Sequence, residues 1–211
     1  MARSRVDLSL ALAGAVAASA GDVALLWVAW AADGRLGLAA APPGTLLAGH
    51  YLGVLGIPLY ALGYRALADG IADAAPAAAR WVRGLGAVGA VVGAAIHGLT
   101  GALTAVAIRT GAPTAPDALA AAPEARFLLP LWLVVGAALA IGSVVFAVVV
   151  ARGRTRFPRG LAACTPLVST IMMASGAAPF PLAAAFVVPA APNFAHVVLF
   201  AAALIGRHDT R

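Results

Sequence analysis

The stretch that most constrains this chain runs from Leu8 to Ala32, an apolar segment of about 25 residues with a single charge, Asp22. About 20 apolar residues in a helix span the hydrocarbon core of a bilayer. A carboxylate near the middle of such a helix costs on the order of 3 kcal/mol to insert. The sequence therefore predicts a membrane helix whose acid is compensated by polar groups on other helices.

Five more apolar stretches follow, separated by charged or Pro- and Gly-rich connections. The six predicted spans are residues 8–32, 45–67, 81–108, 127–151, 159–177 and 181–206. The chain is 63% apolar and only 10% charged, whereas about a quarter of the residues in a soluble domain are charged. We predict an all-α fold in which 1–211 forms a single transmembrane domain, a polytopic bundle of six helices.

The N-terminal run also imitates a secretory signal, because Arg3 and Arg5 precede an apolar stretch and the Ala-Ser-Ala of residues 18–20. The apolar run continues past that site to Ala32, so we expect a retained first helix.

The basic residues are distributed unevenly between the predicted connections. All fourteen are Arg, against eight acids, which gives a formal charge of +6. A nucleic-acid-binding module would need a basic face or a recognisable motif, and here the Arg residues lie between apolar spans instead. Eleven of them fall on the side that holds both termini. By the positive-inside rule, this asymmetry predicts a multi-pass protein of the cell membrane with cytoplasmic N- and C-termini.

Polar side chains in the other spans lie at a depth similar to that of Asp22. His97 is in the third span, and Asn193 and His196, three residues apart, share a face of the sixth. His50 lies in the first two turns of the second span. A lone intramembrane His or Asn is most often an interhelical hydrogen bond, whereas an intramembrane acid is by default a functional residue.

The chemistry that this set suits best is proton transfer to an apolar substrate. We predict Asp22 as the general acid, with His97 and His196 as catalytic imidazoles that reload it. The predicted substrate-binding residues are His50, Asn193, Trp27, Trp30, Tyr51, Tyr64, Thr100, Thr104, Trp132, Ser169 and Met172. Aromatic faces, including that of Tyr60, would stabilise a passing cation. The predicted partners are the lipid bilayer and a hydrophobic small molecule. We predict no metal site, since no HExxH spacing occurs, and no cofactor; no feature sets the oligomeric state.

Short motifs along the chain carry a resemblance. They are GD in the first span, a Tyr- and Pro-bearing second span, a His in the third, LPLW opening the fourth and PN in the sixth. This layout resembles a family of small actinobacterial integral membrane proteins related to membrane-integral terpene cyclases. The resemblance implies a protonation-initiated, class II-like terpene cyclisation in secondary metabolism, with Asp22 as general acid.

Two other classes of function use the same residues. A b-type haem protein would take axial ligands from His50, His97 and His196. A proton-coupled small transporter or receptor would use Asp22 and the imidazoles as a relay.

Overall fold

The fold is all-α, as predicted. The computed structural model describes residues 2–32, 44–110 and 125–207. Within these ranges there are seven α-helices and two 3₁₀ helices. They are α1 (Ala2–Ala32), α2 (Thr45–Gly56), η1 (Ile57–Leu59), α3 (Tyr60–Ile71), α4 (Pro76–Thr110), α6 (Ala125–Ala151), η2 (Arg159–Cys164), α7 (Pro166–Ala177) and α8 (Pro181–Gly206).

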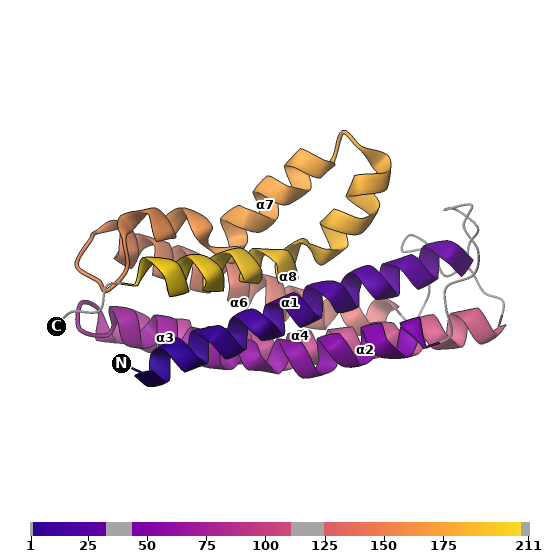
Figure 1. Ribbon diagram of the computed structural model, residues 1–211, viewed down its shortest axis with the longest axis horizontal. Coiled ribbons are helices and arrows are strands. Elements are labelled where there is room, and N and C mark those ends of the chain that lie inside the picture. The colour runs from indigo at the N-terminus through magenta and orange to yellow at the C-terminus, as the bar shows by residue number, and fades with distance from the viewer. Residues whose placement is uncertain (1, 33–43, 111–124, 208–211) are drawn as a thin grey trace.

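Five of the predicted spans are long and apolar enough to cross a membrane. They are formed by α1, by α2 and α3 joined through η1, by α4, by α6 and by α8. Figure 1 shows α1, α2, α3, α4 and α6 running along the long axis of the molecule. Pro58 lies in the short 3₁₀ turn between α2 and α3, where a proline removes a backbone donor. These helices indicate a multi-pass membrane protein.

The predicted span at 159–177 differs in the structure. It is divided into η2 and α7, and α7 has only 12 residues, or about 18 Å at the rise of an α-helix. The cause is Pro166, which holds the preceding Thr165 in an extended conformation and then occupies the first turn of α7. Figure 1 shows α7 diverging from the axis of the bundle.

Glycines let α1 and α2 approach closely. A Cβ at Gly21 would lie 2.7 Å from the carbonyl oxygen of Gly49, and one at Gly56 would lie 2.6 Å from that of Gly14. Real side chains do not tolerate such distances, so these positions require glycine, as is common where membrane helices cross. The close crossing places the backbone of α2 beside the middle of α1, where Asp22 lies.

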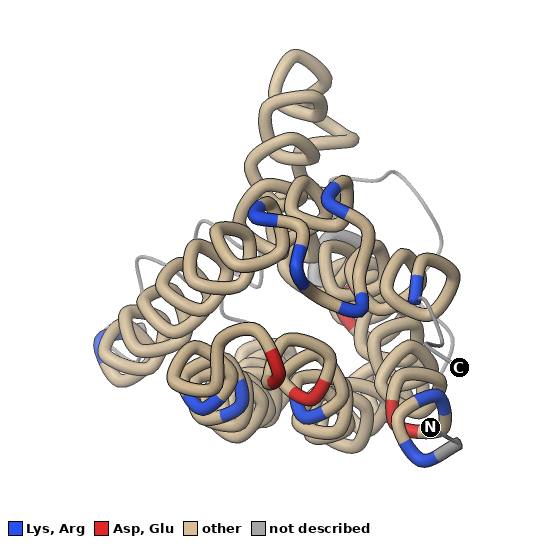
Figure 2. Tube along the Cα trace, turned by 90° about the vertical axis from the view of Figure 1, so that its left-hand side faces the viewer, with Lys and Arg blue, Asp and Glu red and all other residues tan. Residues whose placement is uncertain are grey.

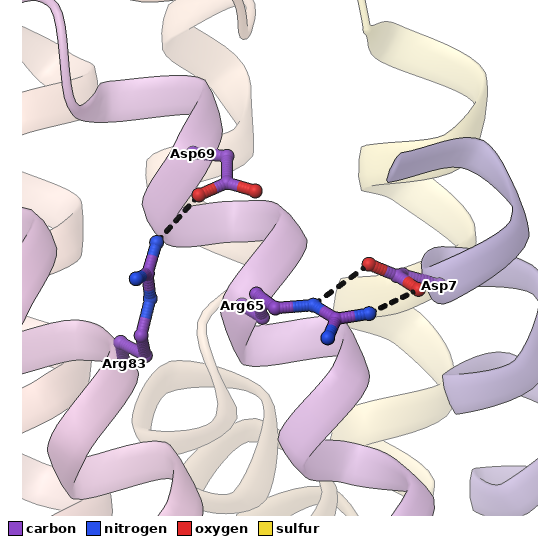
Figure 3. A network of polar contacts seen from close by, with 4 residues as sticks. All are labelled: Asp7, Arg65, Asp69 and Arg83. Atoms are coloured by element: carbon purple, nitrogen blue, oxygen red, sulfur yellow. Dashed lines mark hydrogen bonds and ion pairs between the residues drawn. The ribbon is translucent and has the colours of Figure 1, made fainter. Parts of the chain in front are cut away.

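Charged residues gather at one end of the bundle, as Figure 2 shows on the helix ends that face the viewer. Arg65 on α3 donates two hydrogen bonds to Asp7 on α1, at 2.7 and 3.0 Å (Figure 3). Asp69 pairs with Arg83, and Asp73 pairs with Arg156. Segments predicted to share one side of the membrane therefore meet at one end. Which face of the membrane this end occupies stays a prediction.

Candidate functional site

The carboxylate of Asp22 receives polar side chains from two other helices. Asn193 on α8 donates its Nδ2 hydrogen to Asp22 Oδ2 at 2.6 Å. His97 on α4 places Nδ1 at 3.2 Å from Asp22 Oδ1. Only 17% of the Asp22 side chain is exposed. Its partners are thus an imidazole and an amide, and no Arg is among its contacts in the described part of the chain.

The backbone of α2 determines which ring nitrogen of His97 carries a hydrogen. His97 Nε2 lies 3.0 Å from the carbonyl oxygen of Gly49, and a carbonyl only accepts hydrogen bonds, so Nε2 must bear a hydrogen. The imidazole packs so closely under Gly53 that a Cβ there would overlap its ring. With Nε2 protonated, a hydrogen bond between His97 Nδ1 and Asp22 Oδ1 requires one further proton, on the nitrogen or on the oxygen. In either position, the pair that holds this proton has no net charge.

A second chain of hydrogen bonds orients the other side of the carboxylate. The hydroxyl of Tyr60 donates to Asn193 Oδ1 at 2.7 Å, which directs the amide nitrogen of Asn193 towards Asp22. Sequence reasoning named Tyr60 only as a ring face and missed this role. Its signal is the spacing to Tyr64, because residues four apart share a helix face and both hydroxyls reach α8.

His196 lies one turn from Asn193 but does not touch Asp22. Its Nδ1 lies 2.6 Å from the carbonyl oxygen of Pro192 and must therefore carry a hydrogen. Its Nε2 then accepts a hydrogen bond from the hydroxyl of Tyr64 at 2.9 Å. The ring stacks on Tyr60 with centroids 4.4 Å apart. The contacts of His196 therefore hold the two tyrosines in place.

A cavity of about 150 Å³ opens beside these groups. Asp22, His97 and Asn193 form a polar edge, and the walls are mainly apolar. The other lining residues are Leu25, Leu26, Ile57, Tyr60, Tyr64, Gly89, Ala90, Gly93, Ile96, Thr100, Trp132, Val135, Leu139, Pro189, Pro192 and His196. Trp132 on α6 and Pro189 on α8 are both exposed. Since both residues line the cavity, it reaches the surface of the molecule at α6 and α8.

The structure thus brings together seven of the residues predicted for the site. They are Asp22, His97, His196, Asn193, Tyr64, Thr100 and Trp132. The side chain of Trp30 is outside the described part of the chain.

Six other predicted residues do not line the cavity. They are Trp27, His50, Tyr51, Thr104, Ser169 and Met172. His50 faces α4 at Gly98 and Gly101, where its buried Nδ1 has no partner among the described residues. Thr104 is buried, and Tyr51 and Trp27 are turned outward. Ser169 and Met172 are remote because α7 diverges from the bundle; Ser169 is buried and Met172 is 68% exposed.

The haem alternative requires imidazole nitrogens with free lone pairs. Both ring nitrogens of His97 are engaged, with Asp22 and Gly49, and both of His196 are engaged, with Pro192 and Tyr64. Among the described residues, no three His, Cys, Asp or Glu side chains are grouped to hold a metal ion. These contacts do not favour axial ligation by His97 or His196.

Comparisons with known proteins give one match. The model of a family of unknown function matches residues 1–208. No curated protein and no solved structure matches the chain, so the resemblance to terpene cyclases receives no support from them. Function must therefore be argued from the site.

Proposed function

We propose that the chain, which belongs to a family of unknown function (DUF6796), is an integral membrane enzyme that protonates a hydrophobic, isoprenoid-type substrate and isomerises it, as in a class II-like terpene cyclisation. The observation that carries the proposal is the Asp22–His97 pair, which holds one proton at the edge of an apolar cavity.

The proposed step transfers that proton to the substrate. An O–H bond of Asp22 breaks. With an alkene, a C–H bond forms from the π electrons and the other alkene carbon becomes a carbocation. With an epoxide, an O–H bond forms on the oxygen and a C–O bond of the ring breaks, which leaves the carbocation on that carbon. The cation is attacked by a second double bond of the same molecule. The reaction ends when a carbon next to the cation returns a proton to Asp22. Substrate and product are then isomers, and the acid is regenerated.

Charge balance supports this assignment. The pair is neutral before transfer and carries one negative charge afterwards, while the substrate gains one positive charge. The Asp22 carboxylate therefore faces the carbocation as its counter-ion, held by Asn193. Electrostatic stabilisation by preoriented groups in a site with little water is usually the largest contribution to catalysis.

The walls of the cavity fit an apolar chain and a transient cation. The rings of Tyr60 and Trp132 lie along the cavity, and aromatic faces attract cations. The exposure of the lining residues Trp132 and Pro189 suits a substrate that enters from the bilayer. We propose Tyr60, Asn193 and His196 as positioning residues, and the Arg-rich end as the cytoplasmic end.

Deuterium labelling tests the proposal. The protein, purified into lipid nanodiscs in D₂O, is incubated with a panel of C10 and C15 polyenes and their terminal epoxides. Isomeric products are then sought by mass spectrometry. From an alkene we expect an isomer that carries deuterium at the protonated carbon. From an epoxide the deuterium enters an exchangeable hydroxyl, so the readout there is the isomer itself. Both isomers should be lost with Asp22→Asn.

Asp73→Asn is the matched control, because Asp73 is an exposed acid at the charged end, and it should give wild-type turnover. Turnover that survives Asp22→Asn, or an isomer formed from an alkene without uptake of solvent deuterium, would contradict the proposed mechanism.

A further inference from the structure

The same cavity has a property that does not depend on turnover. Its polar edge carries one exchangeable proton and no net charge, because Gly49 fixes the Nε2 hydrogen of His97 and one more proton is shared with Asp22. We propose that the cavity binds a small organic monocation of the quaternary ammonium type, and that each cation bound releases the shared proton. The inference uses the Asp22–His97 pair of the proposed function but requires no reaction.

The surroundings of the pair isolate this proton from other titratable groups. From α8, both ring nitrogens of the buried His196 are engaged, with the Pro192 carbonyl and the Tyr64 hydroxyl. From α3, Tyr60 and Tyr64 present neutral hydroxyls. On α2, His50 faces Gly98 and Gly101 on α4 and is not part of the cavity lining.

Among the described residues that line the cavity, none besides this pair and His196 belongs to a charged type. The cavity residues of α6 and the remaining ones of α1 and α4 are uncharged. The described ion pairs, such as that of Asp7 with Arg65, belong to the charged end of the bundle.

Charge balance makes the exchange obligatory. If a cation entered and the shared proton stayed, the apolar cavity would hold a net positive charge, and an uncompensated buried charge costs several kcal/mol. If the proton leaves, the Asp22 carboxylate and the cation compensate one another. No covalent bond to the ligand forms or breaks. The bond between the proton and Asp22 or His97 is the one that breaks, and the proton goes to solvent.

Size and wall chemistry indicate the class of cation. A cavity near 150 Å³ is similar to one known to hold a benzene molecule. Aromatic faces such as that of Trp132 favour quaternary ammonium groups, which have no hydrogen to donate. Benzyltrimethylammonium combines both features. Neopentylbenzene is its uncharged counterpart of nearly the same shape, with carbon in place of nitrogen.

Calorimetry on the full chain in nanodiscs tests the proposal. Titration with benzyltrimethylammonium in buffers of different ionisation enthalpy counts the protons released, and we expect one per ligand bound. Because a proton is a product of binding, affinity should rise about tenfold per pH unit while the free pair is protonated. Neopentylbenzene should bind without proton release and without this pH dependence.

Two variants test whether the released proton comes from the Asp22–His97 pair. Asp22→Asn should weaken benzyltrimethylammonium at least tenfold and abolish proton release, while Asp73→Asn should match the wild type. Binding without proton release, equal affinity at every pH, full affinity in Asp22→Asn, or no binding at all would each overturn the inference. These outcomes are separate from the deuterium test: a chain that isomerises no polyene can still exchange a proton for the cation, and one that isomerises polyenes can fail to do so.

Discussion

Two acids of α1, the buried Asp7 and the half-buried Asp22, have different kinds of partner. Asp7 lies at the charged end and receives two hydrogen bonds from the guanidinium of Arg65 (Figure 3). Asp22 lies in the middle of the span with an imidazole and an amide. Arg stays protonated in proteins, so the first pair has no proton to give. The second retains one, and it faces a cavity. Asp7 therefore holds helices together, whereas Asp22 is the acid that we propose transfers a proton.

The largest expected effect is the loss of turnover in Asp22→Asn. Removal of a general acid lowers rates by about 10²–10⁴-fold, and the amide can still accept from Asn193 and bond to His97. We therefore expect at least a hundredfold loss of isomer formation with an unchanged thermal unfolding midpoint in detergent. If Asp22→Asn instead unfolds more readily while its folded fraction stays active, Asp22 has a structural role like that of Asp7.

Asp7→Asn should show the reverse pattern. Only 5% of Asp7 is exposed, and its loss leaves the guanidinium of Arg65 partly buried without its counter-ion, which we expect to cost about 2 kcal/mol. Thermal unfolding should move to lower temperature, while turnover per folded molecule stays at the wild-type value. In a double-mutant cycle with Arg65→Gln, the two losses should not add. Full additivity would show that the interaction between Asp7 and Arg65 contributes nothing to the free energy of unfolding.

A smaller effect is expected when His97 is displaced without being replaced. Gly53→Ala places a methyl group against the imidazole, so the ring must move away from the Gly49 carbonyl or from Asp22. We expect turnover to fall about tenfold, on the order of one charge-assisted hydrogen bond. Gly84→Ala is the matched control, because a Cβ there meets no atom within 4 Å. Equal turnover in both variants would show that the position of His97 is immaterial.

The smallest effect belongs to the exposed pair of Asp73 and Arg156. The Asp73 side chain is 78% exposed, and exposed ion pairs contribute at most about 1 kcal/mol. Asp73→Asn should lower the unfolding temperature by less than Asp7→Asn, and the difference from wild type should disappear at high salt. A loss as large as that of Asp7→Asn would mean that burial does not separate the two pairs.

Much of the fold and part of the site could be predicted from the sequence. Hydropathy located the five long spans, and the cost of a lone acid in a membrane predicted partners for Asp22. Helical periodicity placed His97 and Asn193 at the right depth. These predictions depend only on position along the chain, which determines depth within a span and spacing along a helix.

Rotation about the helix axis could not be predicted in the same way. His50 shares the polar character of His97, yet it faces α4 beside Gly101 and not the cavity, because depth does not determine which neighbour a helix face meets. The continuous span predicted at 159–177 differs from the structure for another reason. Mean hydropathy does not detect Pro166, which divides η2 from α7. With α7 diverging from the bundle, Ser169 and Met172 lie away from the site.

The most direct test of the central claim is the protonation of His97 in the folded protein. Nitrogen-15 NMR of histidine-labelled protein in nanodiscs, assigned with His97→Gln, reports each ring nitrogen separately. We expect Nε2 to bear a hydrogen at every pH at which the protein is folded, while Nδ1 changes to the lone-pair form when the pair loses its proton. An Nε2 without hydrogen would contradict the proposed proton transfer, because Gly49 would then not fix the proton and the Asp22–His97 pair would have none to share.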